Sequence, residues 1–158
     1  GVEVGIKWPN DILLNRKKLV GILTEMDCDM EKIHSVTVGM GINVNTEAFP
    51  EELQDIATSL YLETGREYDR AEIAGCVMKR FEALYEEFLK KGSVFAPFKE
   101  RYRRKCLNIG KEVRGIGRET YLAMALDITP EGELIVKRKD NGAEEVVFSG
   151  EVSIREKE

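Results

Sequence analysis

The sequence predicts an α+β protein in which an antiparallel, mixed-sheet half-domain with packed helices precedes a small β-barrel. Three features indicate this class. Apolar, β-branched runs separated by polar turns fill residues 1–45, and apolar residues at helical spacing fill residues 51–105. From Asn108 onward, glycines separate short β-rich runs, a texture typical of small all-β units.

The first part of the chain is expected to form an antiparallel meander. Its predicted strands are Gly1–Trp8, Ile12–Leu14, Lys18–Met26 and Ile33–Val44. Pro9 ends the first strand because proline cannot donate a hydrogen bond to a neighbouring strand. The later connections are short, which favours antiparallel pairing. The centre of this sheet is apolar on both faces, and the helices that follow can cover only one of them.

Three helices are expected in the middle of the chain. They are Glu51–Glu63, a helix between Asp69 and Gly92, and Val94–Lys105. Asp69 and Glu72 stand in the relation of a capping box, so the first backbone amides find acceptors. We interpret the aromatic stripes on these helices as core.

The last part of the chain is expected to form an SH3-like barrel. Its predicted strands are Lys111–Gly115, Glu119–Asp127, Glu133–Arg138, Glu144–Phe148 and Val152–Arg155. Pro-Glu-Gly and Asp-Asn-Gly sequences between them are strong turn signals. The predicted domains are therefore residues 1–107 and 108–158.

Composition excludes several classes of protein. The chain of 158 residues is 42% hydrophobic and 34% charged, as in soluble globular proteins. Its formal net charge of −5 argues against a general nucleic-acid binder. No apolar run approaches a membrane helix, and no signal-peptide pattern is present, so a cytoplasmic protein is expected. Cys28, Cys76 and Cys106 are an odd number without metal-ligand spacing, which favours free thiols and no metal site. Cys76 and Cys106 fall on apolar stripes and are expected in the core.

Polar residues at the strand ends of an apolar sheet are the first candidates for chemistry. Lys18 precedes an apolar strand, and Asp11 lies seven residues earlier, a separation that a hairpin can close. Gly21 and Gly39 suit a close approach of the backbone to a ligand. Each has a structural alternative: a turn lysine for Lys18, an Asx-turn for Asp11, and β-bulges for the glycines.

Three blocks of sequence carry a resemblance to a known family. Lys-Trp-Pro-Asn-Asp (7–11), Lys-Lys-Leu-Val-Gly-Ile-Leu-Thr-Glu (17–25) and Gly-Met-Gly-Ile-Asn-Val-Asn (39–45) resemble the second half of the catalytic domain of biotin–protein ligases. Ser-Gly-Glu-Val-Ser-Ile-Arg (149–155) resembles the end of that family's C-terminal barrel. The resemblance covers nearly the whole chain. The family's upstream half, with the glycine- and arginine-rich loop that closes over biotin, has no counterpart here.

The resemblance implies a function. Family members use ATP and Mg²⁺ to convert biotin to biotinyl-5′-AMP, and transfer the biotinyl group to a lysine of a biotin carboxyl carrier protein. Lys18, directly before Leu-Val-Gly-Ile-Leu, would be the catalytic lysine that touches the carboxylate and the α-phosphate. Asp11 would orient Lys18 and the incoming amine. Lys7 would add positive charge, and Asn10 a positioning hydrogen bond. Trp8 is expected to pack. The remaining implied contacts are Gly21, Ile22, Leu23, Gly39, Gly41 and Ile42 with biotin, Asn43 with adenosine, and Arg155 with the nucleotide.

Two rival functions remain open at this point. A lipoate ligase shares the fold class and the adenylation chemistry, and a non-catalytic interaction or dimerisation module is the alternative of another class. The expected partners are the carrier protein, the missing N-terminal half of the catalytic domain and a second copy of the chain. DNA would be a partner only if an upstream DNA-binding domain exists, and no membrane partner is expected. Alone, the chain is expected to be inactive, and its uncovered apolar face is expected to make it self-associate or to remain as a large exposed patch.

Overall fold

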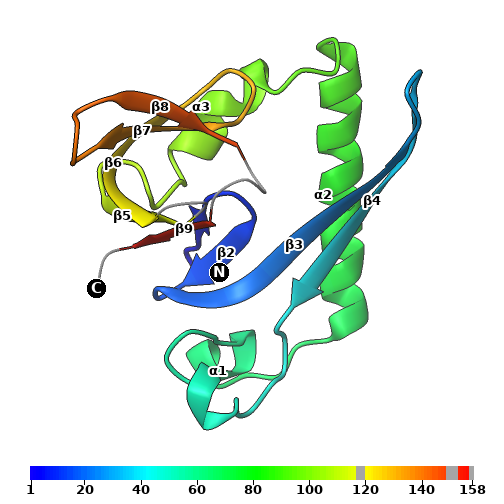
Figure 1. Cartoon of the computed structure of the whole chain (residues 1–158). Helices are drawn as coiled ribbons and strands as arrows, with labels where there is room; N and C mark the ends of the chain where they lie inside the picture. The colour runs from blue at the N-terminus through cyan, green and yellow to red at the C-terminus, as the bar shows by residue number, and fades with distance from the viewer. Residues whose placement is uncertain (117–119, 149–152, 157–158) are drawn as a thin grey trace. The chain divides into compact units, whose positions relative to one another are not determined.

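The computed structural model describes residues 1–116, 120–148 and 153–156 (Figure 1). The chain is α+β with two antiparallel sheets, which confirms the predicted class at that level. It divides into two compact units. The first contains residues 1–5 and 10–74, and the second contains residues 6–9 and 75–158. The boundary predicted between residues 107 and 108 stays a prediction.

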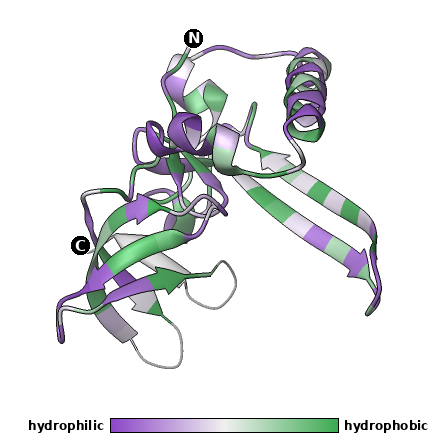
Figure 2. Cartoon of the chain, turned by 90° about the horizontal axis from the view of Figure 1, so that it is seen from above, coloured by the Kyte–Doolittle hydropathy of each residue, from purple (hydrophilic) through white to green (hydrophobic). Residues whose placement is uncertain are grey.

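The first sheet contains the predicted meander. Its strands, in the order β1-β2-β3-β4, are β1 (Gly5–Lys7), β2 (Asp11–Leu14), β3 (Lys17–Cys28) and β4 (Ile33–Ile42). β2 pairs antiparallel with β3, and β3 with β4. Figure 2 shows the long β3–β4 hairpin, along which apolar and polar residues alternate.

Most of this hairpin is exposed, which agrees with the expectation that an apolar face of this sheet stays uncovered in this chain. Leu23 is 62% exposed, Met26 58% and Ile33 61%. The buried side chains of the first unit lie near the start of the hairpin instead. They are Leu14, Leu19, Val44, Thr58 and Ser59.

The predicted helix Glu51–Glu63 is also wrong. Its residues form a 3₁₀ turn, η1 (Glu51–Leu53), and a short helix, α1 (Leu60–Thr64). Between them the backbone is extended and pairs with β3: Lys18 N donates to Ile56 O at 2.8 Å, and Thr58 N donates to Lys18 O at 2.9 Å. A bridge of this kind requires extended backbone, so a continuous helix cannot form. Ser59 then caps α1, because its Oγ accepts from Leu62 N at 3.1 Å.

The long helix α2 (Arg70–Lys90) begins as predicted. Asp69 Oδ1 accepts from Ala71 N at 2.8 Å. The interpretation of its apolar stripe as core is wrong for the described residues, since none of its side chains is buried and Cys76 is exposed. Within the stripe, the rings of Phe81 and Tyr85 stack at a centroid distance of 6.1 Å. The predicted third helix is shorter than expected: a 3₁₀ turn η2 (Ala96–Phe98) and α3 (Lys99–Arg103). No helix in the described part of the chain is long and apolar enough to cross a membrane.

The second sheet contains the five strands expected in the last part of the chain. They are β5 (Glu112–Ile116), β6 (Thr120–Ile128), β7 (Leu134–Arg138), β8 (Glu144–Val147) and β9 (Ser153–Glu156). The order is β8-β7-β6-β5-β9, and every pairing is antiparallel. β8 and β9 lie at opposite edges in the described pairings, so these pairings do not confirm a closed barrel.

The core of the second unit lies on this sheet. It is built from Trp8, Cys106, Val113, Ala123, Ala125, Ile128, Leu134, Val136 and Val147. The burial predicted for Cys106 is confirmed, and this burial raises the pKa of its thiol. The packing role predicted for Trp8 is confirmed as well, since the side chain is 2% exposed.

We predict that Gly115→Ala destabilises the second unit. A Cβ atom on Gly115 would overlap the ring of Tyr121, its partner across β5 and β6. The Arg138 guanidinium covers that ring at 4.5 Å from its centroid, which opposes its displacement. Such overpacking costs about 1–3 kcal/mol of the free energy of unfolding, which urea titration measures. Gly75→Ala is the control: no atom lies within 4 Å of the added Cβ in α2. A gain of about 0.5–1 kcal/mol is expected there. A Gly115→Ala midpoint equal to wild type would contradict this account.

Candidate functional site

A β-bulge sets the orientation of Lys18. Asp11 pairs with Gly21 and Ile12 with Val20, but the next residue of β2, Leu13, pairs with Lys18. Leu19 is therefore an extra residue on β3, and it is buried. A bulge reverses the alternation of faces beyond it, so Lys18 lies on the same face as Asp11 and Gly21.

Lys18 and Asp11 form an ion pair on this face. Lys18 Nζ lies 2.7 Å from Asp11 Oδ1, with the lysine side chain 46% exposed and the aspartate side chain 19% exposed. The predicted closure of the hairpin is confirmed. An exposed pair of this kind contributes only about 0.2–1 kcal/mol to stability. Its importance is geometric, because it fixes the direction of an ammonium group that stays accessible to a ligand.

Gly21 provides the space for this ammonium. A Cβ atom at Gly21 would lie 2.8 Å from Lys18 Cε and 2.9 Å from its Nζ. The close approach of the Lys18 side chain therefore explains why position 21 is occupied by glycine. The register of β3 and β4 is continuous from Val20 to Asp27, so the alternative that Gly21 and Gly39 mark β-bulges is wrong.

Three sets of hydrogen bonds hold the backbone of the site. The bridge to Ala57 fixes the backbone of Lys18 from one side. On the other side, Asn10 O accepts from Ile22 N at 2.9 Å, and Asn10 Nδ2 donates to Ile22 O at 2.6 Å. Asn43 N donates to Leu19 O at 3.0 Å, which ties the end of β4 to the bulge. Asn10 and Asn43 thus hold the backbone around Lys18 through hydrogen bonds.

The register of β3 and β4 places the residues expected to contact biotin on two different faces of the sheet. Gly21 pairs with Gly41 and Leu23 with Gly39, so these four lie on the face of Lys18. Ile22 and Ile42 pair with Met40 and Val20, and their side chains lie on the opposite face. A Cβ atom at Gly39 or Gly41 would meet its nearest neighbour at 3.7 or 3.9 Å, which is ordinary contact. The fold alone does not require these two glycines, and an open face beside Lys18 suits a flat ligand.

Lys7 and Arg155 belong to the second unit, so their roles toward a ligand stay predictions. Lys7 ends β1, and the backbone of Arg155 pairs with Arg114 on β5.

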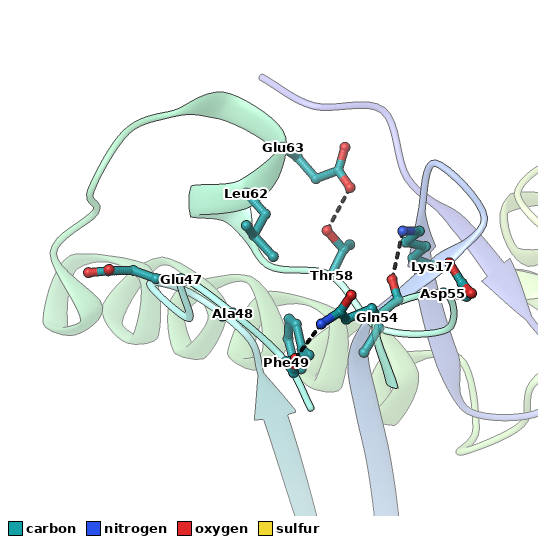
Figure 3. A pocket seen from close by; sticks show the side chains of 10 residues that line it. Lys17, Glu47, Ala48, Phe49, Gln54, Asp55, Thr58, Leu62 and Glu63 are labelled. Carbon is teal, nitrogen blue, oxygen red and sulfur yellow. Dashed lines mark hydrogen bonds between the residues drawn. The ribbon is translucent and has the colours of Figure 1, made fainter. Parts of the chain in front are cut away.

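A cavity of about 440 Å³ lies in the first unit and contains none of the predicted site residues (Figure 3). Lys17 lies on the opposite face of β3 from Lys18 and donates to Gln54 O at 2.7 Å. Thr58 Oγ1 donates to Glu63 Oε1 at 2.6 Å on another wall. No local sequence signal indicates this cavity, because it is created by the bridge between β3 and the segment before α1. In the part of the chain that the structure describes, no group of three His, Cys, Asp or Glu side chains is arranged to hold a metal ion.

Comparison with known proteins places this site in a family. Residues 1–43 match the model of the biotin/lipoate A/B protein ligase family. That match defines the class, which is the biotin and lipoate protein ligases. Residues 109–155 match the biotin protein ligase C-terminal domain, which narrows the class from biotin and lipoate ligases to biotin ligases. The chain belongs to the biotin protein ligase family.

Similar proteins agree with this assignment. The bifunctional ligase/repressor BirA of Bacillus spizizenii is 41% identical over 143 residues, which are 89% of this chain and 43% of that protein. The biotin–[acetyl-CoA-carboxylase] ligase of Mycobacterium tuberculosis is 37% identical, with 93% of this chain and 51% of that protein covered. The structure of the Aquifex aeolicus biotin protein ligase in complex with biotin and ATP superposes with a TM-score of 0.83 and 33% identity. It covers 99% of this chain and 63% of that one. The chain thus spans about half the length of the curated relatives it matches.

Proposed function

We propose that this chain supplies the lysine-bearing part of the active site of a biotin–protein ligase. The reaction is the activation of biotin with ATP to biotinyl-5′-AMP, followed by transfer to a lysine of a biotin carboxyl carrier protein. The observation that carries the proposal is the Lys18–Asp11 pair, held by a bulge on an open glycine-lined face. The names of the Mycobacterium relative and of the Aquifex complex with biotin and ATP support it.

Adenylation brings two anions together. The biotin carboxylate attacks the α-phosphorus of ATP, an O–P bond forms, and pyrophosphate leaves. Negative charge rises where the carboxylate and phosphate meet, so a preorganised cation there lowers the barrier. Lys18 supplies that cation, and Asp11 and the bulge hold it in place. Mg²⁺ enters as the counterion of ATP, held largely by the phosphates, as is usual for this ion.

Transfer requires a neutral amine. The carrier lysine attacks the acyl carbonyl, an amide bond forms, and AMP leaves with the bonding electrons. In this step Lys18 polarises the carbonyl. The carboxylate of Asp11 attracts the incoming ammonium and accepts its proton.

The exposed apolar side chains of the β3–β4 hairpin and α2 have a role in this proposal. We propose that they pack against an N-terminal half of the catalytic domain; this chain covers only 43% of the Bacillus spizizenii relative, which is consistent with such a further part. That half would also supply the loop over the adenylate. We further propose that the second sheet is the family's SH3-like barrel and that the enzyme is cytoplasmic.

We predict that Gly21→Ala in the ligase lowers adenylate formation while the fold stays intact. The added Cβ displaces Lys18 Cε and Nζ, the mobile end of a half-exposed side chain, so the cost to stability is small. A misplacement of about 1 Å can cost about 10²-fold in rate. Pyrophosphate exchange and urea titration on the same preparation measure both effects. Wild-type exchange would show that the position of Lys18 does not matter.

Calorimetry separates this proposal from its rivals. The ligase should bind biotin, and ATP should bind with it. An interaction module should show no heat with either ligand. A lipoate ligase should prefer lipoate, although the C-terminal match and the names of the relatives favour biotin.

A further inference from the structure

The turn before Lys18 is tied to helix α1 through one carboxylate, that of Glu63. Its Oε1 accepts from Thr58 Oγ1 at 2.6 Å, and its Oε2 accepts from Asn15 Nδ2 at 2.5 Å. Glu63 lies in α1, and Asn15 lies in the turn between β2 and β3. Figure 3 shows the bond between Thr58 and Glu63 at the wall of the cavity. Hydrogen bonds to a carboxylate are stronger than those between neutral groups, so Glu63 links the two segments firmly.

These bonds close a ring that contains Lys18. Thr58 N donates to Lys18 O at 2.9 Å, and Lys18 N donates to Ile56 O at 2.8 Å. The ring runs from Lys18 to Thr58, on to Glu63 and Asn15, and returns along the backbone from Asn15 to Lys18. Thr58 is 2% exposed, so water reaches its bond to Glu63 poorly. Every member of the ring belongs to the first unit.

Helix α1 is itself anchored, so Glu63 projects from a fixed support. Ser59, the N-cap of α1, is 0% exposed, and its Oγ donates to Thr46 O at 2.6 Å. Leu60 N donates to Asn43 O at 3.0 Å, which joins the start of α1 to the residue that follows β4. Glu63 therefore connects the turn before Lys18 to a part of the unit that is held in place by buried bonds.

We propose that Glu63 is a positioning residue for Lys18. Through Asn15 it holds the turn that precedes β3, and through Thr58 it holds the extended segment that pairs with Lys18. Both contacts restrain the Lys18 backbone, whereas the bulge and the ion pair with Asp11 set the direction of its side chain. The catalytic consequence rests on the proposed function, but the structural restraint does not.

Amide hydrogen exchange in the ligase, with no substrate present, measures this restraint. Glu63→Ala removes both acceptor oxygens and keeps a good helix former in α1. The amides of Lys18 and Thr58 should then exchange about tenfold faster or more, since a lost hydrogen bond to a charged group is worth at least about that factor. The amide of Ile22, bonded to Asn10 O in the same unit, is the internal control and should change by less than about twofold.

Two matched variants separate positioning from the loss of a charge. Glu63→Gln keeps both contacts, because its amide oxygen accepts from Asn15 and its amide nitrogen donates to the Thr58 hydroxyl. It should restore most of the protection of the Lys18 and Thr58 amides. Glu47→Ala removes a carboxylate that lines the same cavity without joining the ring, and it should change neither amide.

A third variant keeps the test decisive if Glu63→Ala does not fold. Asn15→Gly removes the side chain that reaches Glu63 and tolerates the positive φ of 49° at this position. Because this bond is exposed, the same pattern should appear with a smaller amplitude. Wild-type exchange at Lys18 and Thr58 in the folded variants, or equal acceleration at Ile22, would overturn the proposal.

Adenylation by the ligase tests the catalytic consequence. Glu63→Ala should lower adenylate formation by about tenfold, because small misplacements of a catalytic group have effects of that order. Glu63→Gln should restore most of the rate. In a Lys18→Gln background, Glu63→Ala should cost less than about twofold, since residues that act through one another are not additive. Fully additive losses would contradict action through Lys18. A ligase that activates no biotin would refute the proposed function while leaving the exchange result intact.

Discussion

Lys18→Gln in the ligase should lower the rate of biotinyl-adenylate formation by about 10²–10³-fold, the usual loss for one preorganised donor to a transition state. Glutamine keeps most of the stem and removes the charge. The lysine is 46% exposed and its stabilising ion pair is weak, so the folded state should persist. Pyrophosphate exchange with saturating biotin and ATP measures the effect.

Lys17→Gln is the matched control for this variant. Lys17 is the neighbouring residue, but it lies on the other face of β3 and its ammonium donates to Gln54 O. Its replacement should leave adenylation within about threefold of wild type, the range of a lost exposed contact. Equal losses for both variants would mean that general positive charge, and not the placement of Lys18, drives the step.

Asp11→Asn should affect the two half-reactions unequally. Adenylation should fall by less than about tenfold, because the neutral amide can still accept a hydrogen bond from Lys18 and the lost ion pair is half exposed. Transfer to the carrier lysine should fall by about 10²-fold or more, as expected when a proton acceptor is removed.

The pH dependence of transfer identifies the cause. The carrier amine has an ordinary pKa of about 10.4, so raising the pH increases the fraction that is already neutral. Transfer by Asp11→Asn should therefore gain more between about pH 7 and 9.5 than transfer by wild type. The measurement is single-turnover transfer from preformed adenylate, beside adenylation in the same preparation. If both half-reactions slow equally, or the pH gain matches wild type, Asp11 only organises the site.

The lysine site was predictable because its parts are close in sequence. Asp11 and Lys18 are joined by one hairpin, and their closure follows from strand pairing. The bulge at Leu19 was not predictable, since it depends on which residues of β2 and β3 pair. Without the bulge Lys18 would face away from Asp11.

Long-range contacts account for the main differences between the predicted and the observed structure. Residues 51–63 have a clear helical stripe, but the bridge of Ala57 to Lys18 overrides that local preference. The helical spacing of the aromatic residues of α2 predicts an apolar face, but it does not indicate what covers that face. The burial of Asn108 is not predictable from the sequence, because its partner Trp8 is 100 positions away and nothing in its neighbourhood marks a buried asparagine.

The most direct test of the central claim is the intact mass of a carrier domain after incubation with the ligase that contains this chain, MgATP and either biotin or lipoate. The predicted result is the addition of one biotinyl group to one carrier lysine, its loss with Lys18→Gln, and little or no addition of lipoate. A folded ligase that attaches lipoate in preference to biotin, or that biotinylates equally well without Lys18, would contradict the account.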